Sequence, residues 1–245
     1  MLPRPDPSES DAPIHAALAD GPPESNTEGQ AVSFRARSWP GGGGRLIDLG
    51  GIFVAESAVI VGDVELGPGT NVWPFVAIRG DVAPIRVGRR VSIQDHVMLH
   101  CRHGVALEIG DDVVIGHHAC VHCARVGSGT LVGIGSRILD DAVIGAGCVV
   151  AAGAVVTPGT KVPEGMVVAG VPARVLRPVE QRDRDYVARV AARYVRLAAS
   201  HVAGGFPPWN GTNPMPQGWE SGWLPESPAA SDVTTPSCDL GKGDA

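Results

Sequence analysis

Aromatic residues, positive charge and long apolar runs are all scarce in this chain of 245 residues. Phe, Trp and Tyr make up 4% of it, and Asp and Glu outnumber Lys and Arg by 26 to 20, which gives a formal net charge of −6. A nucleic-acid-binding surface needs basic patches and stacking rings, so this composition argues against one. The most apolar run, residues 143–156, is short and broken by glycines. It is therefore not expected to span a membrane.

Two further signals are missing. The five cysteines show neither zinc-finger nor thioredoxin spacing, and their odd number does not indicate a disulfide framework. The N-terminus lacks the charged-then-apolar pattern of a secretory signal. We therefore expect a cytoplasmic protein.

The strongest pattern present is an aliphatic residue at every sixth position, often followed by glycine. A helix would repeat its apolar positions at three and four residues and an ordinary strand at two, so a six-residue period indicates a hexapeptide solenoid rather than a β-sandwich. Hexapeptide prisms of this kind are known to wind left-handed. The predicted fold is an all-β solenoid, a left-handed parallel β-helix with a C-terminal α-helix packed along it. The repeat positions are Val54, Ile60, Leu66, Val72, Ile78, Val87, Ile93, Leu99, Ile109, Ile115, Val121, Val126, Val132, Ile138, Ile144, Val150, Val156, Val162 and Val168.

Composition divides the chain into four segments. Residues 1–44 are rich in Pro, Ser, Gly and acidic residues, so we expect a disordered extension. The β-helix domain is expected over 45–178 and the helix over 179–203, where Gly204 and Gly205 would end it. The tail, 204–245, is again Pro/Gly/Ser-rich and is expected to be disordered, with Trp209, Trp219 and Trp223 scattered through it.

The expected helix has an apolar stripe that would cover one flank of the prism. Three arginines, Arg189, Arg193 and Arg196, fall away from this stripe. The stripe, spaced at three and four residues, is Val187, Val190, Ala191, Tyr194, Ala198 and Val202.

Three histidines stand at particular phases of the repeat. Residues on the six-residue period point inward, so His100 after Leu99 and His122 after Val121 lie outward or at a corner. If three periods make one coil, and if the insertions 79–86 and 100–108 are loops at corners, these two histidines fall on one face of adjacent coils, about 4.8 Å apart. His117 goes with Gln94 on a different face.

Because His117 lies on a different face from His100 and His122, the sequence predicts that several copies of the chain assemble. One prism should not bring His117 to His100 and His122, whereas a neighbouring prism packed face to edge could do so. The simplest symmetric solution is a ring of three copies. A lone surface histidine is usually inert, but three neutral imidazoles with an open position are typical of a catalytic zinc site.

At these residues the chain resembles the gamma-class carbonic anhydrases. The resemblance covers about residues 45–200 and rests on three motifs. They are Arg79-Gly80-Asp81; Ser92-Ile93-Gln94-Asp95 with His100; and Gly116-His117 with His122. It implies a homotrimer holding zinc, or iron or cobalt in its place, with His100 and His122 from one subunit and His117 from its neighbour.

The resemblance also implies a reaction and roles. A metal-bound hydroxide would attack carbon dioxide to give bicarbonate. Gln94 resembles the family glutamine that orients the metal-bound oxygen, and Arg79, Asp81 and Asp95 look like the family's salt-bridge set across the subunit seam. A purely structural role for the two aspartates is an equal alternative.

The chain departs from the family's best-studied type at three places. Val82 stands where that type has glutamate, Ser92 replaces an asparagine, and the loop after His100 is short and lacks an acidic proton shuttle. Histidine titrates near neutral pH, so we predict that His103 in this loop takes over proton transfer. A merely solvated loop histidine is the alternative.

Two other functions stay open at this point. The same solenoid hosts hexapeptide acyltransferases and acyl-CoA thioesterases, and fold alone does not decide function. Enzymes of that class usually rely on one histidine and a pantetheine groove. The third possibility is a metal-binding scaffold of the same family with no turnover.

Overall fold

The structure, a computed structural model, describes residues 32–34, 45–122 and 125–204. The segments expected to be disordered, 1–44 and 204–245, lie outside the described residues except for strand β1 (Val32–Phe34) and Gly204. The three tail tryptophans also lie outside them. β1 pairs antiparallel with β4 (Val59–Leu66). No helix in the described part of the chain has the length and hydropathy needed to cross a bilayer.

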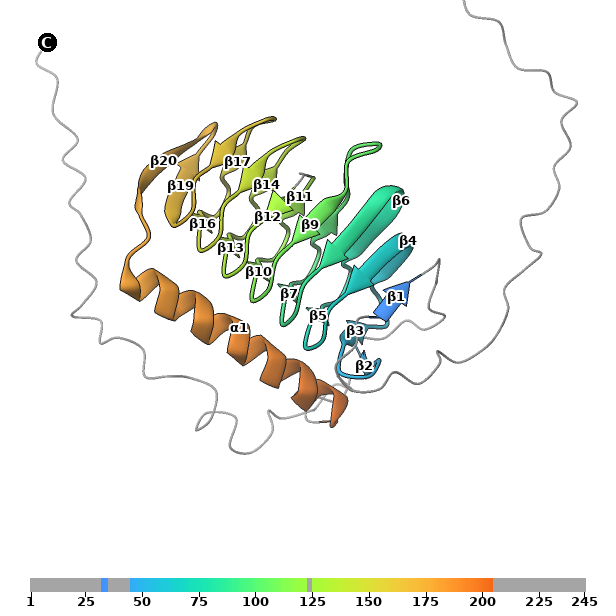
Figure 1. Cartoon of the computed structure of the whole chain (residues 1–245). Coiled ribbons are helices and arrows are strands. Elements are labelled where there is room, and N and C mark those ends of the chain that lie inside the picture. Colours follow the sequence, from blue (N-terminus) through green and yellow to red (C-terminus); the bar gives the residue numbers. More distant parts are fainter. Residues whose placement is uncertain (1–31, 35–44, 123–124, 205–245) are drawn as a thin grey trace, which may run out of the picture.

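The described chain is a parallel β-solenoid with one C-terminal helix, as the six-residue period predicts (Figure 1). Its strands form three rows, named here face 1, face 2 and face 3. Face 1 consists of β3 (Phe53–Ala55), β5 (Asn71–Val72), β7 (Ser92–Ile93), β10 (Val114–Ile115), β13 (Leu131–Val132), β16 (Val149–Val150) and β19 (Met166–Gly170).

Faces 2 and 3 are joined by two long strands, β4 and β6 (Ala77–Val87), which run from one face into the next. Face 2 continues through β8 (Met98–Leu99), β11 (Cys120–Val121), β14 (Arg137–Ile138) and β17 (Val155–Val156). Face 3 continues through β9 (Leu107–Ile109), β12 (Arg125–Val126), β15 (Val143–Ile144) and β18 (Lys161–Val162). At the ends of the solenoid, β2 (Leu46–Asp48) and β20 (Ala173–Pro178) pair antiparallel with β3 and β19.

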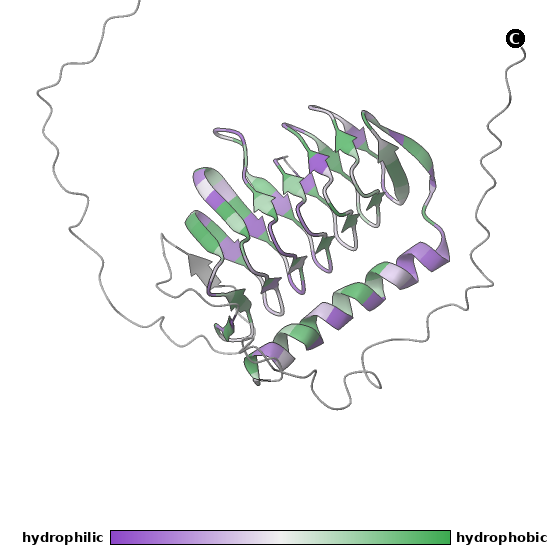
Figure 2. Ribbon diagram, turned by 180° about the vertical axis from the view of Figure 1, so that it is seen from behind, coloured by the Kyte–Doolittle hydropathy of each residue, from purple (hydrophilic) through white to green (hydrophobic). Residues whose placement is uncertain are grey.

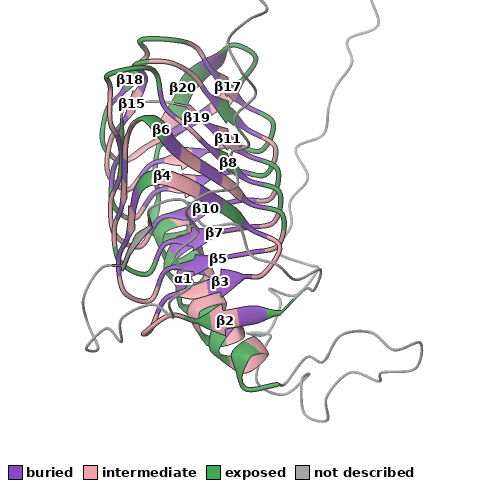
Figure 3. Cartoon of the chain, turned by 90° about the vertical axis from the view of Figure 1, so that its right-hand side faces the viewer, coloured by how far each residue is buried: buried purple, intermediate pink, exposed green. Residues whose placement is uncertain are grey.

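The core is the stack of aliphatic side chains inside the prism. Every residue at the six-residue period is buried, and none is more than 6% exposed. Figure 3 shows the buried positions alternating with exposed turns along each coil. The turn glycines allow the coils to stack closely, since a Cβ added at Gly127 would lie 2.4 Å from the backbone nitrogen of Ala146. Burying a Val, Leu or Ile side chain contributes about 1.5–3 kcal/mol, so the repeat itself supplies most of the driving force.

The C-terminal helix, α1 (Gln181–Val202), lies along face 1 (Figures 1 and 2). Val187 and Ala191 pack against Val114 of β10, and Ala198 is fully buried against the main core. The three predicted arginines are exposed. The stripe ends earlier than predicted, however, because Val202, the last residue of the helix, is 37% exposed. Gly204 follows with a positive φ of 82°, which glycine adopts without strain.

Two contacts fix the ends of α1. Near its start, Arg177 binds Asp183 with a nitrogen–oxygen distance of 2.6 Å, and the backbone N–H of Glu180 donates to Asp183 Oδ2 over 2.8 Å. Near its end, Tyr194 and His201 both stand edge-on to the ring of Trp73, with centroids 5.4 and 5.3 Å away. These contacts set the register of the helix against face 1, and so the place of Tyr194.

Candidate metal centre

His100 and His122 stand one above the other, as their phases predict. Leu99 pairs in register with Val121, and the backbone N–H of His100 donates to the carbonyl of Val121 over 3.1 Å. The two imidazole centroids are 5.1 Å apart, and Nε2 of His122 lies 3.2 Å from Nδ1 of His100. Two imidazole nitrogens therefore converge at the edge of face 2.

Each of these rings is held on its other nitrogen by a carboxylate. Nε2 of His100 lies 2.9 Å from Oδ1 of Asp81, and Nδ1 of His122 binds Oδ1 of Asp140. An ionised carboxylate only accepts hydrogen bonds, so the ring nitrogen facing it carries the proton. The hydrogen bond from His100 lowers the pKa of the Asp81 carboxyl, which keeps this residue an acceptor.

His117 lies elsewhere, at the corner between faces 1 and 2 directly after β10. Its Nδ1 is 2.8 Å from Oδ2 of Asp95, and its Nε2 is 3.4 Å from the hydroxyl oxygen of Tyr194. Within the described residues of one chain, no group of three or more histidine, cysteine, aspartate or glutamate side chains is arranged to hold a metal. The separation of His117 from the other two follows from the registers Ile93–Ile115 and Leu99–Val121.

The hydrogen bonds of the three histidines, as well as their number, fit a metal site. Each has one ring nitrogen bound to a carboxylate, which leaves Nδ1 of His100, Nε2 of His117 and Nε2 of His122 as potential ligands. Carboxylate-bound imidazoles are typical of metal centres, because the carboxylate orients the ring and raises its basicity. Two nitrogens bound tetrahedrally to one zinc lie roughly 3.3 Å apart. The 3.2 Å between His122 and His100 matches that spacing.

The other predicted residues divide between the two parts of the site. Arg79 pairs with Asp81 of its own chain at 2.6 Å, and both are about two-fifths exposed. Asp95 is not brought to that pair; within this chain it binds His117 instead. Gln94 is 5% exposed, and its Oε1 accepts the backbone N–H of His117 over 3.2 Å. Gln94 therefore belongs with His117, as the phases predict, rather than beside His100.

His103 is exposed at the tip of the loop after His100. The loop is held on both sides of it. The guanidinium of Arg102 binds Asp141 over 3.0 Å, and the N–H of Gly104 donates to the carbonyl of Val82 over 3.3 Å. Cys101 in the same loop is buried, and burial raises the pKa of its thiol. This cysteine is therefore a packing residue.

Two residues near the histidines are not predicted from the sequence. Asp140 follows β14, in which Ile138 pairs in register with Val121, and its carboxylate reaches Nδ1 of His122 from one residue past the position opposite that histidine. The spacing pattern places Tyr194 in the apolar stripe of the helix, yet its hydroxyl reaches His117. Desolvation raises the pKa of this phenol, so the hydroxyl stays protonated and donates to His117.

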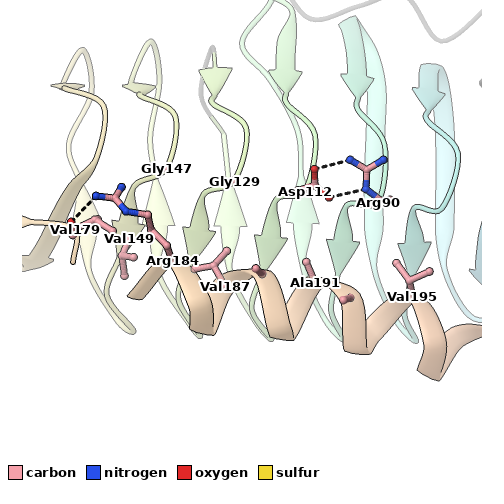
Figure 4. A pocket seen from close by; sticks show the side chains of 12 residues that line it. Arg90, Asp112, Gly129, Gly147, Val149, Val179, Arg184, Val187, Ala191 and Val195 are labelled. Carbon is pink, nitrogen blue, oxygen red and sulfur yellow. Dashed lines mark hydrogen bonds and ion pairs between the residues drawn. The ribbon is translucent and has the colours of Figure 1, made fainter. Parts of the chain in front are cut away.

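A cavity of about 470 Å³ lies away from these histidines, between α1 and the turns that join face 3 to face 1 (Figure 4). Its floor is apolar, from Val187, Ala191 and Val195 of the helix, and the ion pair of Arg90 with Asp112 stands on its rim. None of the described residues that line it is a histidine or a cysteine.

Known proteins similar to this chain carry two kinds of name. The family described as bacterial transferase hexapeptide (six repeats) matches residues 123–158. A solved structure of a hexapeptide transferase family protein from Anaplasma phagocytophilum superposes with a TM-score of 0.58 at 36% identity, covering 61% of this chain and 89% of the other. These matches agree with the solenoid fold.

Several relatives by sequence are named carbonic anhydrases. Carbonic anhydrase of Geobacillus kaustophilus is 44% identical over 151 residues, which cover 62% of this chain and 83% of that protein. Gamma carbonic anhydrase 2, mitochondrial, of Arabidopsis thaliana is 37% identical over 158 residues, and there the match spans 62% of this chain but 57% of the plant protein. The histidine registers described above and these relatives lead to one conclusion. This chain belongs to the gamma-class carbonic anhydrase family.

Proposed function

We propose that this protein catalyses the reversible hydration of carbon dioxide to bicarbonate at a metal site shared between copies of the chain. His100 and His122 of one copy and His117 of the next would hold a divalent metal, zinc first, with iron or cobalt as alternatives. The observation that carries the proposal is the carboxylate on each of the three rings, which leaves the other nitrogen of each ring as a potential ligand for a cation.

The residues around the histidines then have defined tasks. A bound divalent cation would supply Lewis acidity that lowers the pKa of water towards 7, so that hydroxide is available near neutral pH. Asp81, Asp95 and Asp140 hold the imidazoles in place. The amide oxygen of Gln94 is used on the backbone of His117. Its NH₂ group remains as the donor that would orient a substrate oxygen.

Exposed apolar side chains support the contact between copies. On face 2, Met98, two residues before His100, is 39% exposed, and Val59, two coils away on β4, is 51% exposed. At the corner that carries His117, Phe75 is 62% and Ile134 55% exposed. Large apolar side chains gathered on one part of a surface are typical of protein–protein contacts.

The same corner carries a ladder of stacked rings. Phe75 stacks on His96 with centroids 5.0 Å apart, and His96 stacks on His118 at 4.7 Å. Aromatic residues are enriched in protein interfaces. A contact in which a corner of one copy packs on face 2 of the next is heterologous, and it must close into a ring to be finite. Three copies are the simplest closure for a three-sided prism.

Acyl transfer is the second candidate, because the matching family and the similar solved structure are named transferases. The cavity beside α1 would then be the place for an apolar acyl chain. The described residues that line it include neither a histidine nor a cysteine to act as base or nucleophile. The three carboxylate-bound histidines have no role in this alternative, so it explains less of the molecule.

The test begins with purified full-length protein. Light scattering should give the mass of three chains, and metal analysis about one divalent ion per chain. Carbon dioxide hydration is then assayed after aerobic and anaerobic purification, with acyl transfer from acetyl-CoA measured in parallel. A monomer that retains its metal would refute the shared site. A metal-loaded trimer with no hydration under either condition would refute the activity.

Sharing of the site is tested by complementation. His100→Ala and His117→Ala should each lose metal and activity as homotrimers. When the two variants are refolded together, some sites form between one chain of each kind. In such a site the His117→Ala chain can supply His100 and His122, and the His100→Ala chain can supply His117, so all three ligands are present. Mixed trimers should therefore regain part of both properties, whereas each variant refolded alone should not. Mixed trimers that recover nothing would show that the ligand assignment is wrong.

A further inference from the structure

The two converging imidazoles use different nitrogens. His100 presents Nδ1 and His122 presents Nε2 across the 3.2 Å gap. In a free neutral histidine the proton resides mainly on Nε2. His100 therefore needs only the common tautomer, with its Nε2–H donating to Asp81. His122 needs the less common one, with the proton on Nδ1, before its Nε2 lone pair can face His100.

We propose that Asp140 is a positioning residue that sets the tautomer and the ring orientation of His122, and so prepares this nitrogen to bind the metal. The proposal rests on the proposed metal site. Oδ1 of Asp140 is the acceptor that faces Nδ1 of His122, and as a carboxylate it requires a proton on that nitrogen. The hydrogen bond made by one ring nitrogen decides the state of the other.

Asp81 does not play an equivalent part. Its carboxylate is shared between His100 and Arg79, at 2.9 and 2.6 Å. The tautomer that it favours is also the one that His100 would adopt without it. Loss of Asp81 should therefore let the His100 ring change its orientation, but it should not change the tautomer of His100. Asp140 has to provide both for His122, so it should matter more for metal affinity.

The turn that carries Asp140 is braced by its neighbour. Asp141 follows with a positive φ of 59° and binds Arg102 of the loop after His100 over 3.0 Å. This second contact ties the turn after β14 to the loop after β8, two coils away, independently of His122. It keeps the carboxylate of Asp140 in place before any cation binds, and a preformed ligand set loses less conformational freedom on binding.

Two measurements test the proposal. The first is nitrogen NMR of the metal-free protein labelled with ring-¹⁵N histidine, at a pH where the imidazoles are neutral, with the His122 signals assigned from a His122→Gln variant. Nδ1 of His122 should carry a proton in the wild type and lose it in Asp140→Ala. The second is the zinc dissociation constant measured by competition with a chelator, which should rise about 10- to 100-fold in Asp140→Ala.

Asp140→Asn and Asp112→Asn complete the set. The amide oxygen that Asp140→Asn introduces can still accept from Nδ1, so this variant should keep the tautomer and lose less affinity; it also serves if Asp140→Ala does not fold. Asp112 is matched to Asp140, since both are 45% exposed and each binds a basic side chain, and Asp112→Asn should leave zinc affinity unchanged.

The outcomes separate this inference from the proposed function. An unprotonated Nδ1 of His122 in the wild type would overturn it, as would a zinc dissociation constant of Asp140→Ala within twofold of the wild type. If the wild type binds no zinc, the proposed function fails, while the NMR result still decides whether Asp140 sets the tautomer.

Discussion

The hydroxyl oxygen of Tyr194 lies 3.4 Å from Nε2 of His117. This nitrogen is the one left over when Asp95 binds Nδ1, so the helix reaches the atom that the proposed site needs as a ligand. The ring of Tyr194 is held edge-on to Trp73, which is itself 6% exposed and donates its indole N–H to Asn71 over 2.7 Å. The hydroxyl therefore competes with a metal from a fixed position.

Tyr194→Phe should consequently tighten metal binding. The contact is long for a hydrogen bond, and a net contribution of about 0.5–1 kcal/mol would correspond to a two- to fivefold lower zinc dissociation constant, about what the loss of one weak hydrogen bond supplies. Phenylalanine keeps the packing on Trp73. Tyr186→Phe on the exposed side of the same helix is the control and should change nothing. Weaker zinc binding by Tyr194→Phe would mean that the hydroxyl supports His117 instead of competing for it.

The exposed corner gives a second prediction. Ile134 lies one coil beyond His117, since the N–H of the next residue, Gly135, donates to the carbonyl of His117 over 2.8 Å. The side chain of Ile134 is 55% exposed. Ile134→Glu would bury a charge without a partner in the seam, which costs several kcal/mol. The variant should run as a monomer at micromolar concentration in analytical ultracentrifugation and lose its metal at the same time.

Leu176→Glu is the matched control for that experiment. Leu176 is 64% exposed on β20, at the end of the solenoid remote from the histidines. Its substitution should leave the mass of the assembly and the metal content unchanged. If Ile134→Glu stays trimeric with its metal bound, the corner at Ile134 is not part of the seam.

Much of this site could be predicted from the sequence, because a solenoid turns spacing into position. Leu99 and Val121 are 22 residues apart, yet the period places them in adjacent coils once residues 100–108 are read as a loop at a corner, and the structure pairs them. The same reasoning separates His117 from His100 and His122. Asp140 carries a weaker signal, because the register of Val121 with Ile138 puts it one residue past the position opposite His122, and no motif draws attention to it.

The contacts of the helix could not be predicted in this way. The spacing of its apolar residues indicates which side is buried, but not how far the helix is shifted along face 1. That shift depends on Trp73, which contacts both Tyr194 and His201. It places Tyr194 against His117 and leaves Val202 exposed.

The start of α1 gives a prediction about pH. Arg177 holds the pKa of Asp183 at about 2, below the ordinary value of 3.8. Since the folded-state pKa is the lower one, the stabilisation is complete above about pH 4 and is lost as the pH falls through about 2. At pH 7, Asp183→Asn should cost about 1 kcal/mol, as capping losses do, and lower the thermal midpoint by about 2–4 °C.

The gap between Asp183→Asn and the wild type should shrink as the pH is lowered from 4 towards 2, measured by circular dichroism melts. Asp185→Asn is the control, because it removes one negative charge from the same helix. The carboxylate of Asp185 accepts a hydrogen bond from the side chain of Gln181 over 2.8 Å. This variant should stay within about 0.5 kcal/mol of the wild type. A gap that is constant over the whole pH range would show that the ion pair with Arg177 contributes nothing.

The last prediction concerns proton transfer by His103. Hydration of carbon dioxide releases a proton, and fast turnover needs a group that passes it to buffer. Val82 cannot do this, and the loop from Cys101 to Ala106 contains no carboxylate. His103 is exposed between two anchored neighbours, Arg102 on Asp141 and Gly104 on the carbonyl of Val82. The His103 side chain is therefore held in contact with solvent, in the loop that begins directly after His100.

We expect His103→Ala to lose turnover in weak buffer, by about 10-fold or more, because proton transfer by a positioned side chain typically contributes 10²–10⁴-fold. Concentrated imidazole should restore the rate, since the small molecule replaces the missing side chain. The metal content and the mass of the assembly should not change, which separates a shuttle from a structural role. Unchanged turnover in weak buffer would mean that His103 is only a solvated loop residue, and that the proton leaves the site by another route.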